Sequence, residues 1–269
     1  MGKAKDLIVK PISAQDANRI VRQLHYSGKV VNNSQLHLGV FMDGKCGGAM
    51  QFGPSLDKRK MLGLVTGTLW NEFIELNRMA FADWLPRNGE SRCIGYAMRW
   101  IKKTYPHIKW VVSFADGTQC GDGTIYRASG FVLTGCQVNK SIWVFPDGET
   151  VADMGIKTGH DWQRKRFGKV LLATQALHEA QRLGAKPIKG FQLRYIYFLD
   201  PTARERLTVP ILPFSEIDKC GAGMYKGKQR QQSCAGSVRG DTPLDQSGEG
   251  GSSPTPALHS QKADHAAQA

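Results

Sequence analysis

The 269-residue chain is 41% hydrophobic, which is enough for a sizeable core. It contains no run of about eighteen apolar residues, the length that a membrane-spanning helix needs. Its formal net charge is +13, and all of that excess lies before Gly227, because the remaining residues carry equal numbers of acids and bases. A globular body this basic suggests a polyanionic partner, with nucleic acid as the first candidate and a charged solubility surface as the alternative.

The first eighty residues predict one helix and four strands. Runs rich in apolar residues indicate strands at residues 6–11, 36–42, 46–52 and 72–81. After the first strand, Ser13 can cap a helix over residues 14–24, in which apolar side chains recur on one face. Asp43 and Gly44 are a strong short-range turn signal between the next two strands, so we expect these strands to form a hairpin.

Strand and helix alternate in the next seventy residues. After a loop at residues 86–91, helical spacing of apolar residues predicts a long helix over 92–103. A short helix holds Ile125, Tyr126 and Ala128. Strands are expected on either side of it, at residues 109–115, 131–136 and 141–145. This order predicts one mixed α/β domain with a mixed sheet over residues 1–150.

The composition changes after residue 150. Residues 151–190 carry eight Lys or Arg and three acids, and a helix over 170–183 and a strand over 191–199 are expected. We interpret residues 151–226 as a basic extension that packs on the domain and is a candidate DNA contact. Residues 227–269 hold few large apolar residues, which predicts a disordered tail.

Six cysteines are scattered through the chain without short paired spacing. They stand at positions 46, 93, 120, 136, 220 and 234. This pattern argues against a zinc module, and without an apolar signal segment it argues against a disulfide framework. We therefore predict a protein of the reducing cytoplasm.

The segment from Ser113 to Phe131 ends a buried strand on Asp116 and continues through glycines into the short helix with Tyr126. Gly130 after the last helical turn fits a left-handed cap. In CoA-dependent N-acyltransferases of the GNAT type, a strand, a tyrosine-bearing helix and a Gly-Phe exit face the thioester sulfur. The segment resembles that half-site and implies a GNAT-like acyltransferase fold.

A wider set of motifs resembles the phage Mom family of DNA-modification proteins over roughly residues 6 to 226. The motifs are Leu24-His25-Tyr26-Ser27-Gly28, Glu75-Leu76-Asn77-Arg78, Ser113-Phe114-Ala115-Asp116, Thr124-Ile125-Tyr126-Arg127-Ala128, Phe198-Leu199-Asp200-Pro201 and Ala222-Gly223-Met224-Tyr225-Lys226. The resemblance implies an enzyme that converts adenine in double-stranded phage or prophage DNA to N6-carbamoylmethyladenine. In a bacterial host cell this modification would protect the DNA from restriction.

Two other functions stay open. One is a GNAT N-acetyltransferase acting on a small amine or a protein, and the other is a non-catalytic DNA-binding module on a GNAT fold. The resemblance implies acetyl-CoA or a related donor. Because a carbamoylmethyl group is joined through its methyl carbon and carries an amide nitrogen, simple acetyl transfer cannot produce it. Either another donor is used, or the methyl group is activated, for example at a transition metal held by His25 and Asp116.

Four residues are the candidate catalytic groups. Tyr126 matches the GNAT position that reprotonates the leaving thiolate, and the phenol pKa of about 10 lies above a thiol's; the alternative is a core tyrosine. Asp116 follows a buried strand and could accept a proton from adenine N6, or cap a turn. His25 and Tyr26 match a family pair at a helix end, where a histidine can also serve only to cap or pack. Of Asn77 and Arg78, one is expected to bind substrate and the other to face solvent.

Two further groups are candidates for binding. The predicted donor site is the loop before the long helix, whose backbone N–H groups could hold phosphate, and its residues are Arg87, Asn88, Gly89, Ser91 and Arg92. Glu90 would oppose an anion there unless it caps the helix. The predicted DNA contacts are Arg164, Lys165, Arg166 and Lys169. With Trp162 just before them, they mix positive charge and aromatic rings as a contact to the DNA backbone would; a solvated helix face is the alternative.

Overall fold

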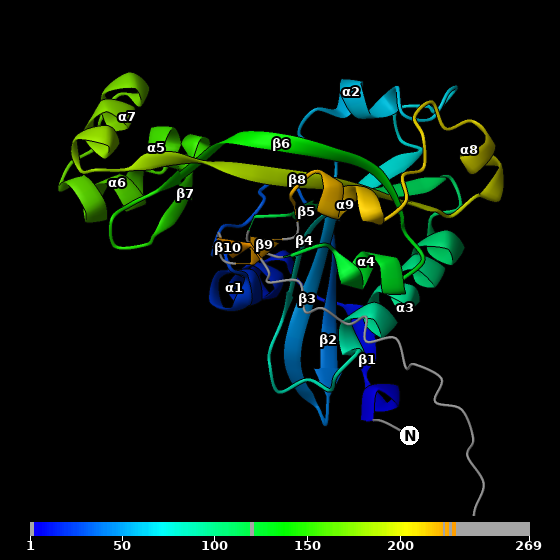
Figure 1. Cartoon of the computed structure of the whole chain (residues 1–269). Coiled ribbons are helices and arrows are strands. Elements are labelled where there is room, and N and C mark those ends of the chain that lie inside the picture. The colour runs from blue at the N-terminus through cyan, green and yellow to red at the C-terminus, as the bar shows by residue number, and fades with distance from the viewer. Residues whose placement is uncertain (1–2, 119–120, 223, 226–227, 230–269) are drawn as a thin grey trace, which may run out of the picture. The chain divides into compact units, whose positions relative to one another are not determined.

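The computed structural model describes residues 3–118, 121–222, 224–225 and 228–229. Cys120 lies outside this part, as do residues 223 and 226 of the motif at 222–226. The predicted tail also lies outside it, apart from residues 228–229. The described chain forms an eight-stranded mixed sheet in the order β1-β2-β3-β4-β5-β8-β6-β7 (Figure 1). This arrangement confirms the predicted mixed α/β class.

The N-terminal elements form as their local sequence predicts. Helix α1 (Ala14–Leu24) begins at Ser13, whose hydroxyl accepts a hydrogen bond from the backbone N–H of Asp16 at 3.0 Å. Strands β2 (Leu36–Met42) and β3 (Lys45–Gly53) form the predicted hairpin. Its turn residues Asp43 and Gly44 both have positive φ, as a tight two-residue hairpin turn requires. Strand β1 (Ile8–Pro11) pairs with β2 at the edge of the sheet.

The two faces of the sheet are covered by different helices. On one face, α1 buries Ala17, Ile20 and Val21 against Ala49 of β3 and Ala80 of β4 (Phe73–Phe81). On the other face, α3 (Gly89–Thr104) and α4 (Thr124–Ala128) belong to the largest hydrophobic cluster. Strand β5 (Trp110–Asp116) pairs with β4 in parallel and contributes alternate residues to the two faces.

Strand β6 (Val132–Val144) corrects one prediction. The sequence indicates two strands, at 131–136 and 141–145, because polar residues stand between them, but the structure has one strand. Its pairing with β8 (Lys186–Phe198) continues through Gln137, Val138 and Asn139, with an irregularity before Ile142. The polar residues mark a bend in the ladder and not the end of a strand.

Strands β6 and β8 extend beyond β5 as a two-stranded ribbon. Strand β5 pairs with β8 only from Gln192 to Phe198, so the earlier residues of β8 pair with β6 alone. This ribbon carries β7 (Thr150–Ala152), α5 (Asp153–Thr158), α6 (His160–Phe167) and α7 (Ala173–Arg182), as Figure 1 shows. They share a small core built on Phe145, Val151, Ile156, Ala176, Ala180 and Ala185. We call residues 138–191 the arm. Because β8 lies between β5 and β6, the sheet draws on both sides of residue 150.

The remaining elements are short. They are a 3-10 helix (Lys3–Asp6), α2 (Lys58–Leu62), α8 (Pro201–Glu205), α9 (Ser215–Lys219), β9 (Met224–Tyr225) and β10 (Lys228–Gln229). Of the helices in the described part, none is long and apolar enough to cross a membrane.

Candidate functional site

Strands β4 and β5 separate halfway along their length. They pair from Phe73 opposite Trp110 to Leu76 opposite Ser113. Beyond that point β4 stays with β3, and β5 stays with β8. At the last pair, the Ser113 Oγ lies 3.2 Å from the Leu76 carbonyl oxygen, so a side chain satisfies this carbonyl where the backbone ladder ends. We call this separation the fork.

A β-bulge in β4 lies directly at the fork. Leu76 stands opposite Phe52 and Arg78 opposite Gln51, so Asn77 is an extra residue in β4. Bulges re-aim side chains, and here Asn77 and Arg78 both line one pocket, so the expectation that one of them faces solvent is wrong. Arg78 is fixed by donating from Nε to the Lys29 carbonyl at 2.9 Å and from Nη1 to the Asn77 carbonyl at 2.7 Å.

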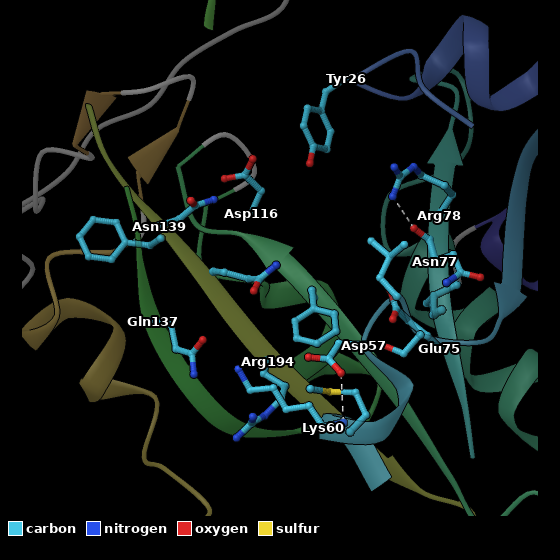
Figure 2. A pocket seen from close by; sticks show the side chains of 17 residues that line it. Tyr26, Asp57, Lys60, Glu75, Asn77, Arg78, Asp116, Gln137, Asn139 and Arg194 are labelled. Atoms are coloured by element: carbon cyan, nitrogen blue, oxygen red, sulfur yellow. Dashed lines mark hydrogen bonds between the residues drawn. The ribbon is translucent and has the colours of Figure 1, made fainter. Parts of the chain in front are cut away.

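The pocket at the fork encloses about 380 Å³. It is lined by Tyr26, Ser55, Leu56, Asp57, Lys60, Met61, Glu75, Leu76, Asn77, Arg78, Phe114, Asp116, Gln137, Asn139, Phe191, Gln192 and Arg194 (Figure 2). Three acids and three cations balance its charge, and three aromatic rings and four side-chain amides complete it. In Figure 2, Tyr26 and Asp116 lie at one end, and Lys60 and Arg194 at the other. Such a lining suits a flat, polar, uncharged heterocycle that hydrogen-bonds in its plane.

Burial changes the acidity of Glu75, one of the three carboxyl groups that line the pocket. The pKa of Glu75 is raised by burial, and hydrogen bonds from Ser55 and Asn77 and the charge of Arg78 offset part of that rise. The carboxyl group therefore holds a proton more readily than an exposed glutamate.

Asp116 and Tyr126, the two leading sequence candidates, lie on opposite faces of β5. Asp116 lines the pocket, and one of its carboxylate oxygens accepts a hydrogen bond from the Thr118 backbone N–H at 2.9 Å. Tyr126 is buried in the core shared with α3, and its ring stacks on Tyr195 at a centroid distance of 5.1 Å. The Tyr126 hydroxyl lies 3.0 Å from the Ser113 Oγ at the fork. Through Ser113 at the fork, Tyr126 on one face of the sheet is therefore connected to the strand that carries Asp116 into the pocket on the other face.

The predicted pair at the end of α1 divides in the structure. Tyr26 is 60% exposed and lines the pocket. His25 is partly buried beneath it, and its ring centroid is 4.4 Å from that of Tyr26. Its Nδ1 accepts a hydrogen bond from the Ser27 backbone N–H at 3.2 Å. Burial, followed by the charge of Arg78, lowers the pKa of His25 to about 4, so the imidazole is neutral at neutral pH.

The possible metal has no further support. In the described part of the chain, no group of three or more His, Cys, Asp or Glu side chains could hold a metal ion. A site built on His25 and Asp116 stays a prediction.

The predicted donor loop forms the first turn of α3. The helix begins at Gly89, three residues earlier than predicted, because Asn88 takes a left-handed conformation with φ of 64°. No side chain caps this end, and the Ser91 hydroxyl donates instead to the Asn88 carbonyl at 3.2 Å. The exposed Arg87 and Arg92 flank it. A helix start without a side-chain cap fits an anion through its backbone N–H groups, and Glu90 in the same turn opposes one.

The predicted DNA contacts lie on α6 and just after it, in the arm. Arg164, Lys165 and Lys169 are exposed, and Arg164 forms a surface ion pair with Asp161 at 2.8 Å. Arg166 has internal partners. It pairs with Asp147 and with Glu149, and its guanidinium lies over the Phe145 ring at 4.3 Å. Arg166 therefore fastens α6 to the turn that joins β6 to β7.

Seven polar residues of the pocket had no place in the sequence prediction, and Ser55 of the turn before α2 is the first of them. The others are Asp57, Lys60, Gln137, Asn139, Gln192 and Arg194. Those on β6 and β8 reach the site only because the two strands pair beside β5, which local periodicity does not show. The basic triplet Lys58-Arg59-Lys60 after a Gly-Pro turn was the one signal that could have drawn attention to α2.

Comparison with known proteins places this geometry in context. The sequence profile of the Mom protein family matches residues 6–216. A methylcarbamoylase, mom, of Escherichia phage Mu is 38% identical over 217 residues, which cover 80% of this chain and 85% of that protein.

Solved structures with similar arrangements include two acetyltransferases. An IAA acetyltransferase from Bacillus cereus covers 71% of this chain and 99% of its own, with 8% identity and a TM-score of 0.40. A spermidine/spermine N-acetyltransferase from Vibrio cholerae covers 75% and 98%, with 9% identity and a TM-score of 0.41. Since both scores lie below 0.5, the GNAT-like description of the fold stays a prediction of the sequence.

Proposed function

Since this chain belongs to the Mom protein family, we propose that it is an enzyme that attaches a carbamoylmethyl group to N6 of adenine in DNA. The phage Mu relative carries the name methylcarbamoylase. The observation that carries the proposal for this chain is the pocket at the fork, because its lining suits a single adenine removed from the duplex.

Adenine has an aromatic face and a hydrogen-bonding edge, and the pocket offers partners for both. Tyr26, Phe114 and Phe191 provide rings for stacking. Side-chain amides such as those of Asn77 and Asn139 can donate to a ring nitrogen and accept from the N6 amine, the pairing that Asn and Gln make with adenine. Because N6 is inaccessible within the base stack, the nucleotide has to swing out of the duplex to reach these groups.

Asp116 is the proposed base. The exocyclic amine is a weak nucleophile, and one N6–H bond breaks as the new N6–C bond forms. The Asp116 carboxylate lies in the pocket at the end of β5 and takes this proton. His25 is uncharged and partly buried, and its ring lies against that of Tyr26, so its role is to position the Tyr26 side chain in the pocket lining.

The donor approaches from the other face of the sheet. The uncapped start of α3 would hold its anionic part, with Arg87 and Arg92 on either side. The donor supplies a carbon that carries an amide, so a CoA-type donor would need more than an acetyl group. As the N6–C bond forms, the bond between this carbon and the leaving group breaks, and Tyr126, linked to the fork through Ser113, donates the proton that the leaving group takes up.

The arm is the proposed contact to the DNA backbone. Arg164, Lys165 and Lys169 are exposed cations on a body with excess positive charge. Acting in the cytoplasm of a bacterial host, the enzyme would protect phage or prophage DNA from restriction.

The test is mass spectrometry of nucleosides from plasmid DNA isolated after expression of the protein. The expected result is deoxyadenosine bearing an added carbamoylmethyl group, which should be absent when Asp116→Asn replaces the parent. If the DNA is unmodified and the purified protein turns over acetyl-CoA in vitro, the protein is an acetyltransferase of a small amine or a protein. Salt-sensitive DNA binding with neither activity would identify a binding module.

A further inference from the structure

Leu56 has the largest exposed fraction, 95%, of any large apolar side chain in the described part of the chain. It stands between the Gly53-Pro54-Ser55 turn and Asp57, the residue that caps α2 by accepting from the Lys60 backbone N–H at 3.2 Å. Water surrounds this side chain almost completely, so packing within the protein does not account for it.

The backbone that carries Leu56 is held firmly. The Pro54 carbonyl accepts hydrogen bonds from Asn33 at 3.3 Å and from Asn77, the bulge residue, at 3.5 Å. A Cβ atom at Gly53 would stand 2.7 Å from the Asn33 carbonyl oxygen and 2.7 Å from the Asn77 Oδ1, so only glycine permits this approach. Ser55, the residue directly before Leu56, is buried. Leu56 is thus an apolar projection on a fixed base.

Leu56 also stands in the lining of the pocket, with Asp57 and Lys60 beside it. Arg59 and Lys60 are exposed, whereas Lys58 lies over the Trp70 ring at 4.5 Å. Two exposed cations therefore follow the projecting leucine, a combination that suits phosphates on either side of an apolar contact.

An enzyme that removes a base from a duplex leaves a gap between the neighbouring pairs, and apolar side chains commonly fill such gaps. We infer that Leu56 enters the base stack as the target adenine moves into the pocket, while Arg59 and Lys60 contact the adjoining phosphates. The inference rests on the proposed function and adds a positioning residue to it. Leu56 makes no contact with the reacting atoms and acts on the equilibrium between stacked and extrahelical adenine.

The experiment compares two duplexes that carry one site mapped as modified in plasmid DNA. In the first the target adenine is paired with thymine, and in the second it faces an abasic position, where less pairing energy opposes its removal. The full-length protein is added with a lysate of the expression host as the source of donor. Modified adenine is measured by mass spectrometry.

For Leu56→Ala we expect a rate on the paired duplex at least about tenfold below the parent, and recovery to within about threefold on the abasic duplex. Leu56→Met should retain most of the activity on both. The matched control is Leu69→Ala, since Leu69 is 68% exposed and lies outside the pocket lining; it should match the parent on both.

Equal rates of the parent and Leu56→Ala on the paired duplex would overturn the inference about Leu56 but leave the proposed function standing. A loss of the same size on both duplexes would assign Leu56 a role in folding or chemistry and would also overturn it. If plasmid DNA from cells that express the parent contains no modified adenine to map, the proposed function itself is overturned, and with it the inference about Leu56.

Discussion

The pocket at the fork and the arm hold their charged groups in different ways. In the pocket, three acids balance three cations, and side chains such as Arg78 are fixed by short hydrogen bonds to the backbone. The arm carries a local excess of Lys and Arg, and Lys165 and Lys169 point into solvent. Fixed, balanced groups suit recognition of one neutral base, whereas loose excess charge suits a phosphate backbone of any sequence. Chemistry and DNA affinity should therefore separate by mutation.

The largest expected effect is the loss of the base in the pocket. Asp116→Asn keeps an oxygen that can accept from the Thr118 backbone N–H, so the local turn should persist. Removal of a general base costs about 10²- to 10⁴-fold in rate, and DNA affinity should change little. Nucleoside mass spectrometry and a DNA-binding titration measure the two. Asp83→Asn, in an exposed loop, is the control. A variant that keeps full activity would remove Asp116 from the mechanism.

Tyr126→Phe tests whether the chemistry reaches through the fork to the other face of the sheet. The stacking on Tyr195 remains possible, and Ser113 can still donate to the Leu76 carbonyl, so stability should fall by about 1 kcal/mol or less. Loss of the proton donor should lower modification by about 10- to 100-fold.

The matched control for this variant is Tyr195→Phe. Its hydroxyl is also buried, and it donates to the Asp122 carbonyl in the same core. It should lose similar stability, measured by urea unfolding, while retaining activity. If both variants lose the same activity, Tyr126 is a core tyrosine and the two faces are not linked.

Acid should weaken the pocket side of the molecule through His25. Its pKa is lowered to about 4 from an ordinary 6.5, so the folded state binds fewer protons than the unfolded state between those values. The contribution of His25 to the free energy of unfolding is therefore fully present above about pH 6.5. It is lost as the pH drops toward 4, which lowers the stability by about 2 kcal/mol. Urea unfolding at pH 4.5 and 7.5 measures this difference.

In His25→Gln the difference should shrink but not vanish, because burial lowers the pKa of His37 as well. Substitution of His178 in the arm is the comparison. If the parent and His25→Gln lose equal stability in acid, the histidine is not held neutral by its surroundings.

The two regions also differed in how far the sequence predicted them. Helix α1 begins and ends where Ser13 and the apolar spacing indicate, and Asp116 lines the pocket as a residue at a strand end should. Local signals were sufficient in both places. The arm depends on the pairing of β6 with β8 across the helices between them. The pairing of β8 with β5 joins segments about eighty residues apart, and together the two pairings bring Gln137 and Arg194 to the pocket. The bulge at Asn77 likewise depends on register with β3, which no local pattern encodes.

The smallest effects are expected in the arm, and there they should differ between neighbouring cations. Lys165→Ala and Lys169→Ala remove exposed charges and should each weaken DNA binding a few-fold, with the slope of log K against log salt falling by about 0.9 per residue. The rate of modification at saturating DNA should stay the same. Arg166→Ala instead removes the partner of Asp147 and Glu149 and the contact over Phe145, so it should lower thermal stability more than it changes the salt slope. If Lys165→Ala leaves the slope unchanged, the exposed cations of the arm are a solvated helix face, and the positive charge that holds DNA lies elsewhere on the body.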